Sequence, residues 1–162
     1  MTVTDVQKDP ENLTLAMVSD LAAPPDRAWE LWADPRQLER WWGPPTYPAT
    51  FVDHDLRPGG VVTYFMTSPE GEKYHGWWKV VSVESPTAIE VLDGFGNPDD
   101  PPNPELPTTT MRMTLEPTDA GSRMTIQSTF GSTEAMEKVL SMGVVEGMTA
   151  ALGQIDDILA AG

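Results

Sequence analysis

His54 is the side chain with the clearest chemical potential in this sequence, because an imidazole changes its charge near neutral pH. The residues around it alternate between apolar and polar types, which places Val52, His54 and Leu56 on one face of a predicted strand. Tyr64 follows in the next alternating run and is the candidate acid–base partner of His54. A single histidine on an apolar face is more often an ordinary core residue, so both interpretations stay open.

A predicted hairpin turn brings these two side chains onto neighbouring strands. Residues 57–60 read Arg-Pro-Gly-Gly, in which proline presets its own φ and glycine accepts a positive φ. After the turn, Val62, Tyr64 and Met66 share one strand face at a period of two. The pattern therefore predicts that His54 and Tyr64 point to the same side of a sheet.

The sequence predicts neither a metal site nor a cofactor. It contains no cysteine, and its two histidines, His54 and His75, fall on opposite strand faces, with His75 toward solvent. Residues 93–97 together with Asp99 and Asp100 supply oxygen ligands, but they lack the spacing of a calcium-binding EF-hand loop and are predicted to form a turn. Nucleophile-elbow, phosphate-loop and dinucleotide-binding motifs are also missing from the sequence.

Charge and composition narrow the classes of partner. The formal net charge of −15 predicts repulsion from nucleic acids and anionic membranes, and it fits either a solubilising acidic surface or a basic protein partner. The N-terminus lacks the features of a signal peptide and no run of about 18 apolar residues occurs, so we expect a cytoplasmic protein without a membrane segment. A length of 162 residues suits one domain.

The N-terminal part of the sequence predicts a tail, a strand and two short helices. Residues 1–11 are polar without a period, which indicates a flexible tail, and a strand of about eight residues begins near Leu13. Residues 26–34 and 35–41 have helical spacing, and Asp34 can cap the second helix.

Two tryptophans, Trp41 and Trp42, close this helical region. Adjacent side chains cannot both face one direction. We therefore expect one indole to pack under the short helices and the other to cover or enter whatever lies beneath.

Alternating apolar residues predict further strands in hairpin succession, at residues 50–66 (two strands), 73–84, 88–95, 109–115 and 124–130. Gly76 lies inside one of them, where a glycine usually marks a bulge, a bend or a close approach. Residues 97–107 hold five prolines and are predicted to form a long extended loop, either functional or a variable decoration.

The C-terminal part of the sequence predicts one long helix. Apolar residues recur at spacings of three and four from Glu134 to Leu159, which gives about 25 residues with one broad apolar face. Gly143 and Gly147 would let this helix approach the sheet closely or bend. Short connections between the strands imply a curved antiparallel sheet of about six to seven strands, wrapped on the long helix in an α+β fold.

Several ordered motifs resemble the START-like (SRPBCC) superfamily, and within it the group named activator of Hsp-90 ATPase homologue-like. They are residues 24–32, 34–35, 41–44 and 55–60, the Gly71 turn, Gly76, and Gly147-Met148 with Leu152. The resemblance covers about residues 13–160 and implies one helix-grip domain, 12–162, with a cavity between the sheet and the C-terminal helix.

On this fold the inward-facing set becomes the candidate ligand-binding set. It comprises Trp42, Val52, His54, Leu56, Tyr64, Met66, Trp78, Met111, Met113, Ile126, Met142, Met148 and Leu152. Methionine side chains adapt to irregular shapes, which suits varied apolar ligands, although they also fill ordinary cores. The group often has tryptophan where this chain has Met148, so the resemblance implies a wider cavity at that point.

Members of the superfamily include lipid and hormone carriers, polyketide aromatase/cyclases and co-chaperone domains. The leading hypothesis is therefore a domain that binds a small hydrophobic or aromatic molecule. One alternative is a cyclase or hydrolase for a polyketide-like substrate that uses His54 and Tyr64 as acid and base. The other is a co-chaperone-like interaction domain with a protein client, and a homodimer also stays open.

Overall fold

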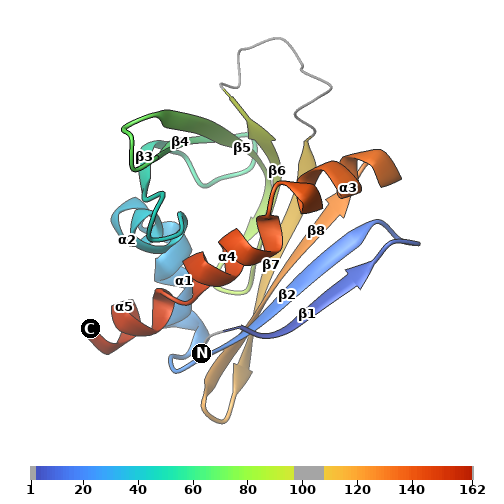
Figure 1. Cartoon of the computed structure of the whole chain (residues 1–162). Helices are drawn as coiled ribbons and strands as arrows, with labels where there is room; N and C mark the ends of the chain where they lie inside the picture. Colours follow the sequence, from blue (N-terminus) through green and yellow to red (C-terminus); the bar gives the residue numbers. More distant parts are fainter. Residues whose placement is uncertain (1–2, 97–107, 162) are drawn as a thin grey trace.

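The computed structural model describes residues 3–96 and 108–161, which form an α+β helix-grip fold. A curved antiparallel sheet of eight strands, in the order β1-β2-β8-β7-β6-β5-β4-β3, is crossed on one face by the C-terminal helices (Figure 1). The predicted loop 97–107 lies outside the described residues. None of the described helices is both long enough and apolar enough to span a bilayer.

The element boundaries follow the predicted order closely. The strands are β1 (Val3–Asp9), β2 (Thr14–Leu21), β3 (Ala49–His54), β4 (Val61–Thr67), β5 (Lys73–Glu84), β6 (Ala88–Phe95), β7 (Thr109–Thr118) and β8 (Gly121–Phe130). The helices are α1 (Pro25–Ala33), α2 (Pro35–Trp41), α3 (Thr133–Ser141), α4 (Val144–Leu152) and α5 (Ile155–Ala161).

Strand β1 corrects the prediction of a flexible tail at residues 1–11 and brings the sheet to eight strands. It pairs antiparallel with β2 along the sheet edge, and Val3 and Val6 pack against the core. The alternation that marks a half-buried strand is missing there, because these valines are three residues apart. Backbone pairing rather than side-chain pattern therefore fixes this strand.

A β-bulge in β3 overturns one predicted side-chain direction. Phe51 pairs with Tyr64, whereas Asp53 pairs with Thr63, so Val52 is an extra residue. Val52 is 65% exposed and points away from the core, although the alternation predicted it to face inward. The Thr63 hydroxyl accepts a hydrogen bond from the Asp53 N–H at 3.1 Å and donates one to the Asp53 carboxylate at 2.7 Å, which stabilises the bulge.

The predicted C-terminal helix is present as a bent arm of three segments, α3, α4 and α5. It bends at Gly143, whose φ of +83° is in the left-handed region. Its first segment is held by Met136 and Val139, which pack with Leu15 and Phe130. Its far end is held in the main core by Leu152, Ile155 and Ile158.

The short helices pack through tryptophans, as the sequence predicted. Trp41 is fully buried beneath them and donates from Nε1 to the Leu31 carbonyl oxygen at 2.9 Å. Trp42 turns toward the sheet, where its ring centroid lies 4.9 Å from that of Trp78 and 5.9 Å from that of Trp32. This edge-to-face cluster joins α1 and α2 to the sheet.

We expect Gly143→Ala to lower the free energy of unfolding by about 1–2 kcal/mol, because an L-residue at that positive φ is strained. Gly147→Ala is the matched control in the same arm: its backbone is helical and no atom lies within 4 Å of an added β-carbon. It should leave the protein equally stable or stabilise it by up to about 1 kcal/mol. Urea denaturation measures both, and a stabilising Gly143→Ala would contradict the bend.

Candidate functional site

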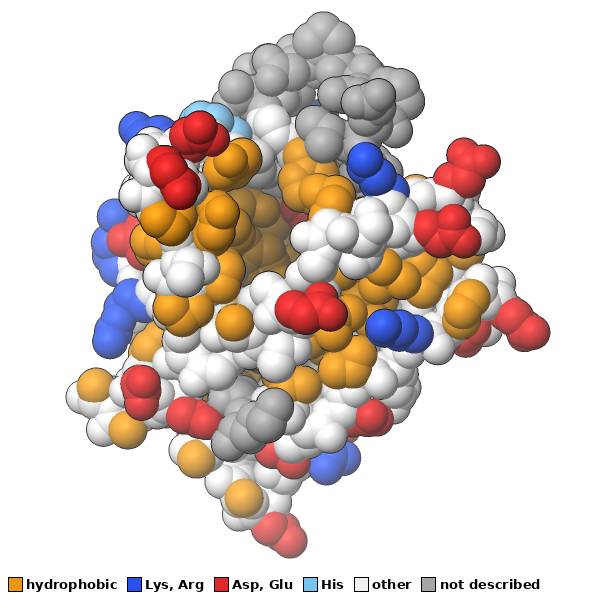
Figure 2. Space-filling view, in the orientation of Figure 1, with side chains coloured by type: hydrophobic (Ala, Val, Ile, Leu, Met, Phe, Trp, Pro, Cys, Tyr) orange, Lys and Arg blue, Asp and Glu red, His pale blue; other side chains and the backbone are white. Residues whose placement is uncertain are grey.

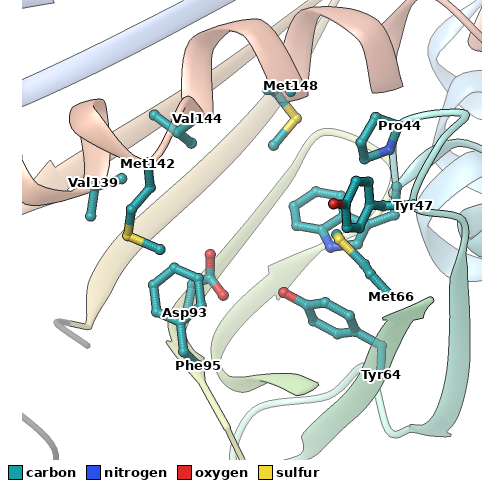
Figure 3. A pocket seen from close by; sticks show the side chains of 12 residues that line it. Pro44, Tyr47, Tyr64, Met66, Asp93, Phe95, Val139, Met142, Val144 and Met148 are labelled. Carbon is teal, nitrogen blue, oxygen red and sulfur yellow. The ribbon is translucent and has the colours of Figure 1, made fainter. Parts of the chain in front are cut away.

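A cavity of about 270 Å³ lies between the inner face of the sheet and the helical arm. Figure 2 shows it as a hollow bordered by hydrophobic side chains. Its walls come from β4, β6, the segment after α2, and residues 139–148 of the arm (Figure 3). The lining residues are Trp42, Pro44, Tyr47, Tyr64, Met66, Asp93, Phe95, Val139, Met142, Val144, Gly147 and Met148.

Most of this lining is apolar, and the two sides differ in kind. The helical side presents the aliphatic and thioether groups of Val139, Met142, Val144 and Met148. The sheet side contributes the aromatic rings of Tyr64 and Phe95, and the segment after α2 contributes those of Trp42 and Tyr47. Such a surface favours an apolar or aromatic guest.

Tyr64 occupies its position because Gly76 leaves room for the ring. The two residues are register partners on β4 and β5, and a β-carbon at position 76 would lie 2.5 Å from the Tyr64 Oη and Cζ atoms. Of the three outcomes predicted for Gly76, the structure shows the close approach. The phenol lies across the glycine, with its hydroxyl directed into the cavity (Figure 3).

Asp93 places a carboxylate in the apolar cavity, where its side chain points into the open space (Figure 3). Burial raises the pKa of this carboxyl from 3.8 to about 7. Among the described residues no ion pair or hydrogen bond to this carboxylate compensates its burial. A carboxyl with a pKa in this range can lose or gain its proton near neutral pH.

The Tyr64 hydroxyl lies between this carboxylate and two indoles. Burial, and secondarily the negative charge of Asp93, raise the pKa of Tyr64. The nearby indole N–H groups of Trp42 and Trp78 act in the opposite direction and lower the pKa of Tyr64. Neither indole nitrogen meets full hydrogen-bond geometry with any described atom, although both are buried.

The structure places the predicted ligand-binding residues in three groups. Trp42, Tyr64, Met66, Met142 and Met148 line the cavity, and Met142 is 48% exposed at its edge. Trp78, Met111, Met113, Ile126 and Leu152 are buried in the core, and Leu56 packs against that core. The remaining two, Val52 on the outer side of the sheet and His54, lie outside the cavity lining.

His54 is not brought together with Tyr64 as the predicted acid–base pair. Its Nε2 lies 3.0 Å from the Trp32 carbonyl oxygen. Because a carbonyl oxygen only accepts, Nε2 carries the proton and donates it to α1. His54 thus ties β3 to the short helices.

Seven lining residues were absent from the predicted set: Pro44, Tyr47, Asp93, Phe95, Val139, Val144 and Gly147. Asp93 was assigned to a turn, although it continues the alternation of the buried residues Ile89 and Val91 along β6. That alternation was the sequence signal that could have placed Asp93 on the inner face of β6. Tyr47 lies in a segment without a period, so no sequence pattern could place it.

Among the described residues no group of three or more His, Asp or Glu side chains could hold a metal ion. His75 is exposed, as predicted.

A family model described as activator of Hsp90 ATPase homolog 1-like protein matches residues 22–160. The chain belongs to this family, which is part of the SRPBCC superfamily. The predicted resemblance is therefore confirmed. No curated protein matches the chain in sequence.

Solved structures give the same fold. A crystal structure of a protein from Mycobacterium smegmatis shares 50% identity with a TM-score of 0.89, and the match covers 98% of both chains. A solution structure of a protein from Arthrobacter aurescens shares 46% identity with a TM-score of 0.93, over 99% of this chain and 94% of that one. A Rhodobacter sphaeroides protein with 21% identity and a TM-score of 0.83 covers 98% of this chain and all of its own, and shows similarity of fold alone.

Asp93→Asn should stabilise the protein above about pH 4, with the full effect reached above about pH 7. The folded-state pKa of about 7 exceeds the ordinary 3.8, so the aspartate costs nothing below about pH 4, destabilises increasingly between about pH 4 and pH 7, and has a constant cost above that range. We expect the variant to exceed the wild type by about 1–4 kcal/mol at pH 8 and to match it near pH 4. Denaturant titrations at both pH values test this, and a pH-independent difference would contradict the burial of the charge.

Gly76→Ala should displace the Tyr64 ring and lower the free energy of unfolding by about 1–3 kcal/mol, because the added carbon overlaps the phenol. Gly131→Ala is the control, since an added β-carbon there meets no atom within 4 Å. Thermal denaturation compares the two. Equal melting temperatures for the two variants would show that Tyr64 is not confined by Gly76.

Proposed function

We propose that this domain binds a small hydrophobic or aromatic molecule in the cavity between the sheet and the helical arm. The observation that carries the proposal is the apolar cavity, which has walls from the sheet, the segment after α2 and the arm. Membership of the SRPBCC superfamily supports it at the level of the fold.

The dimensions favour a ligand of one or two rings. The volume of about 270 Å³ lies just under the range of roughly 300–1,000 Å³ that is usual for ligand pockets. Met66, Met142 and Met148 supply flexible walls that can adjust to the guest. The cavity therefore suits a compact molecule better than a long acyl chain.

The two alternative functions have less support. A cyclase or hydrolase was linked to His54 and Tyr64, but His54 is engaged with α1. An interaction domain of the co-chaperone type rests on family membership, without a particular surface feature that favours it.

Native mass spectrometry of the protein purified from its own host tests the proposal directly. We expect an adduct of a few hundred daltons that is lost on denaturation. A ligand-free protein that also fails to bind any member of a panel of one- and two-ring compounds would overturn the proposal.

Met148→Trp should weaken ligand binding by filling the cavity from α4. We expect the affinity for a naphthalene-sized probe to fall at least about tenfold, which corresponds to about 1.4 kcal/mol. Ala150→Trp adds the same side chain at an exposed position of the same helix and should change the affinity less than about twofold. Isothermal titration calorimetry measures both; equal affinities would place the probe elsewhere.

A further inference from the structure

Among the described residues, the half-buried Asp93 carboxylate has no counter-charge. None of the ten Lys and Arg residues lines the cavity, and the described ion pairs do not involve Asp93. Residues 97–107, which lie outside the described part, contain no Lys, Arg or His. A carboxylate held in an apolar cavity without a partner is costly, and the cost falls when a cation arrives.

The groups around Asp93 leave its carboxylate oxygens free to accept a hydrogen bond from a ligand in the cavity. The indole N–H groups of Trp42 and Trp78 only donate, and they lie near the Tyr64 hydroxyl oxygen. No described hydrogen bond joins the Tyr64 hydroxyl to Asp93, which acts on Tyr64 only through its charge. The carboxylate keeps acceptor capacity on the cavity side.

The walls beside the carboxylate suit a positive charge. Aromatic rings of Trp42, Tyr47, Tyr64 and Phe95 line the same cavity, and the faces of such rings attract cations. The net charge of −15 raises the local concentration of cations over that of anions. The carboxylate, the aromatic rings and the overall charge of the protein all favour a positively charged ligand.

We propose that the ligand is an apolar amine, protonated at neutral pH, whose N–H group donates to Asp93 while its hydrocarbon part fills the cavity. This inference rests on the proposed function and adds the chemical class of the ligand. The competing class is a neutral ketone that accepts a hydrogen bond from a protonated Asp93.

The two classes differ in their pH dependence. Amine binding requires the ionised carboxylate and strengthens as pH rises through about 7, whereas ketone binding weakens over the same range. Tyr64 is the titratable group of β4 that faces Asp93. The register partners of Asp93 are Trp78 on β5 and Thr109 on β7. The helical arm presents only apolar residues to the cavity. Among the described residues, Asp93 alone therefore titrates in this range at the site.

The test compares 1-naphthylmethylamine, 1-naphthalenemethanol and 1-acetylnaphthalene by calorimetry at pH 6 and pH 8. We expect the amine to bind at least about tenfold more tightly than the alcohol at pH 8. Its affinity should be about tenfold higher at pH 8 than at pH 6, as the ionised fraction of Asp93 increases. Methyl NMR signals of Met66, Met142 and Met148 report whether each probe enters the cavity.

Asp93→Asn should abolish the preference for the amine while the alcohol still binds, which also shows that the variant is folded. Glu90→Gln removes the same charge from β6 at a position that does not line the cavity, and should keep the preference. Equal binding of amine and alcohol inside the cavity, or tighter ketone binding that fades at pH 8, would overturn the amine inference alone. If no probe shifts the methionine signals, the proposed function fails as well.

Discussion

The cavity depends on a helical arm that is held at both ends while the sheet curves away beneath its middle. Met136 and Val139 fix the first segment on β2 and β8, and Ile155 and Ile158 fix the last one in the main core. The bend at Gly143 lets both ends be buried at once. Because neither end can slide inward without exposing apolar surface, the space between the arm and the sheet stays open.

A second constraint sets the inner wall of that space. Trp42 packs edge-to-face on Trp78 and Tyr64, with ring centroids 4.9 and 6.1 Å away, and Gly76 gives the Tyr64 ring its place against β5. The helices α1 and α2 are thereby joined to the sheet through ring packing, which adds to the hydrogen bond between His54 and the Trp32 carbonyl oxygen. The same packing brings the indole N–H groups of Trp42 and Trp78 near the Tyr64 hydroxyl.

Patterns of period two and period 3.6 were sufficient to predict the α+β fold, the two short helices and the bounds of β5 and β6, because those residues alternate or repeat regularly. They were insufficient where backbone geometry departs from the ideal repeat. The extra residue at Val52 reverses side-chain direction within β3, and β1 pairs without alternation. Tyr47 reaches the cavity from an aperiodic segment, and only tertiary packing places it there.

Asp93 shows how a site residue can be visible in the sequence and still be missed. Its neighbours Gly94 and Gly96 favour a turn, whereas its alternation with Ile89 and Val91 favours the inner face of a strand. The alternation prevails because Gly94 is not a turn residue here: it makes room for the Trp77 ring on the other side of the sheet. A carboxylate at that inner position destabilises the folded protein at neutral pH, since an asparagine would fit with less cost. Such a loss of stability is expected where the negative charge serves ligand binding rather than folding.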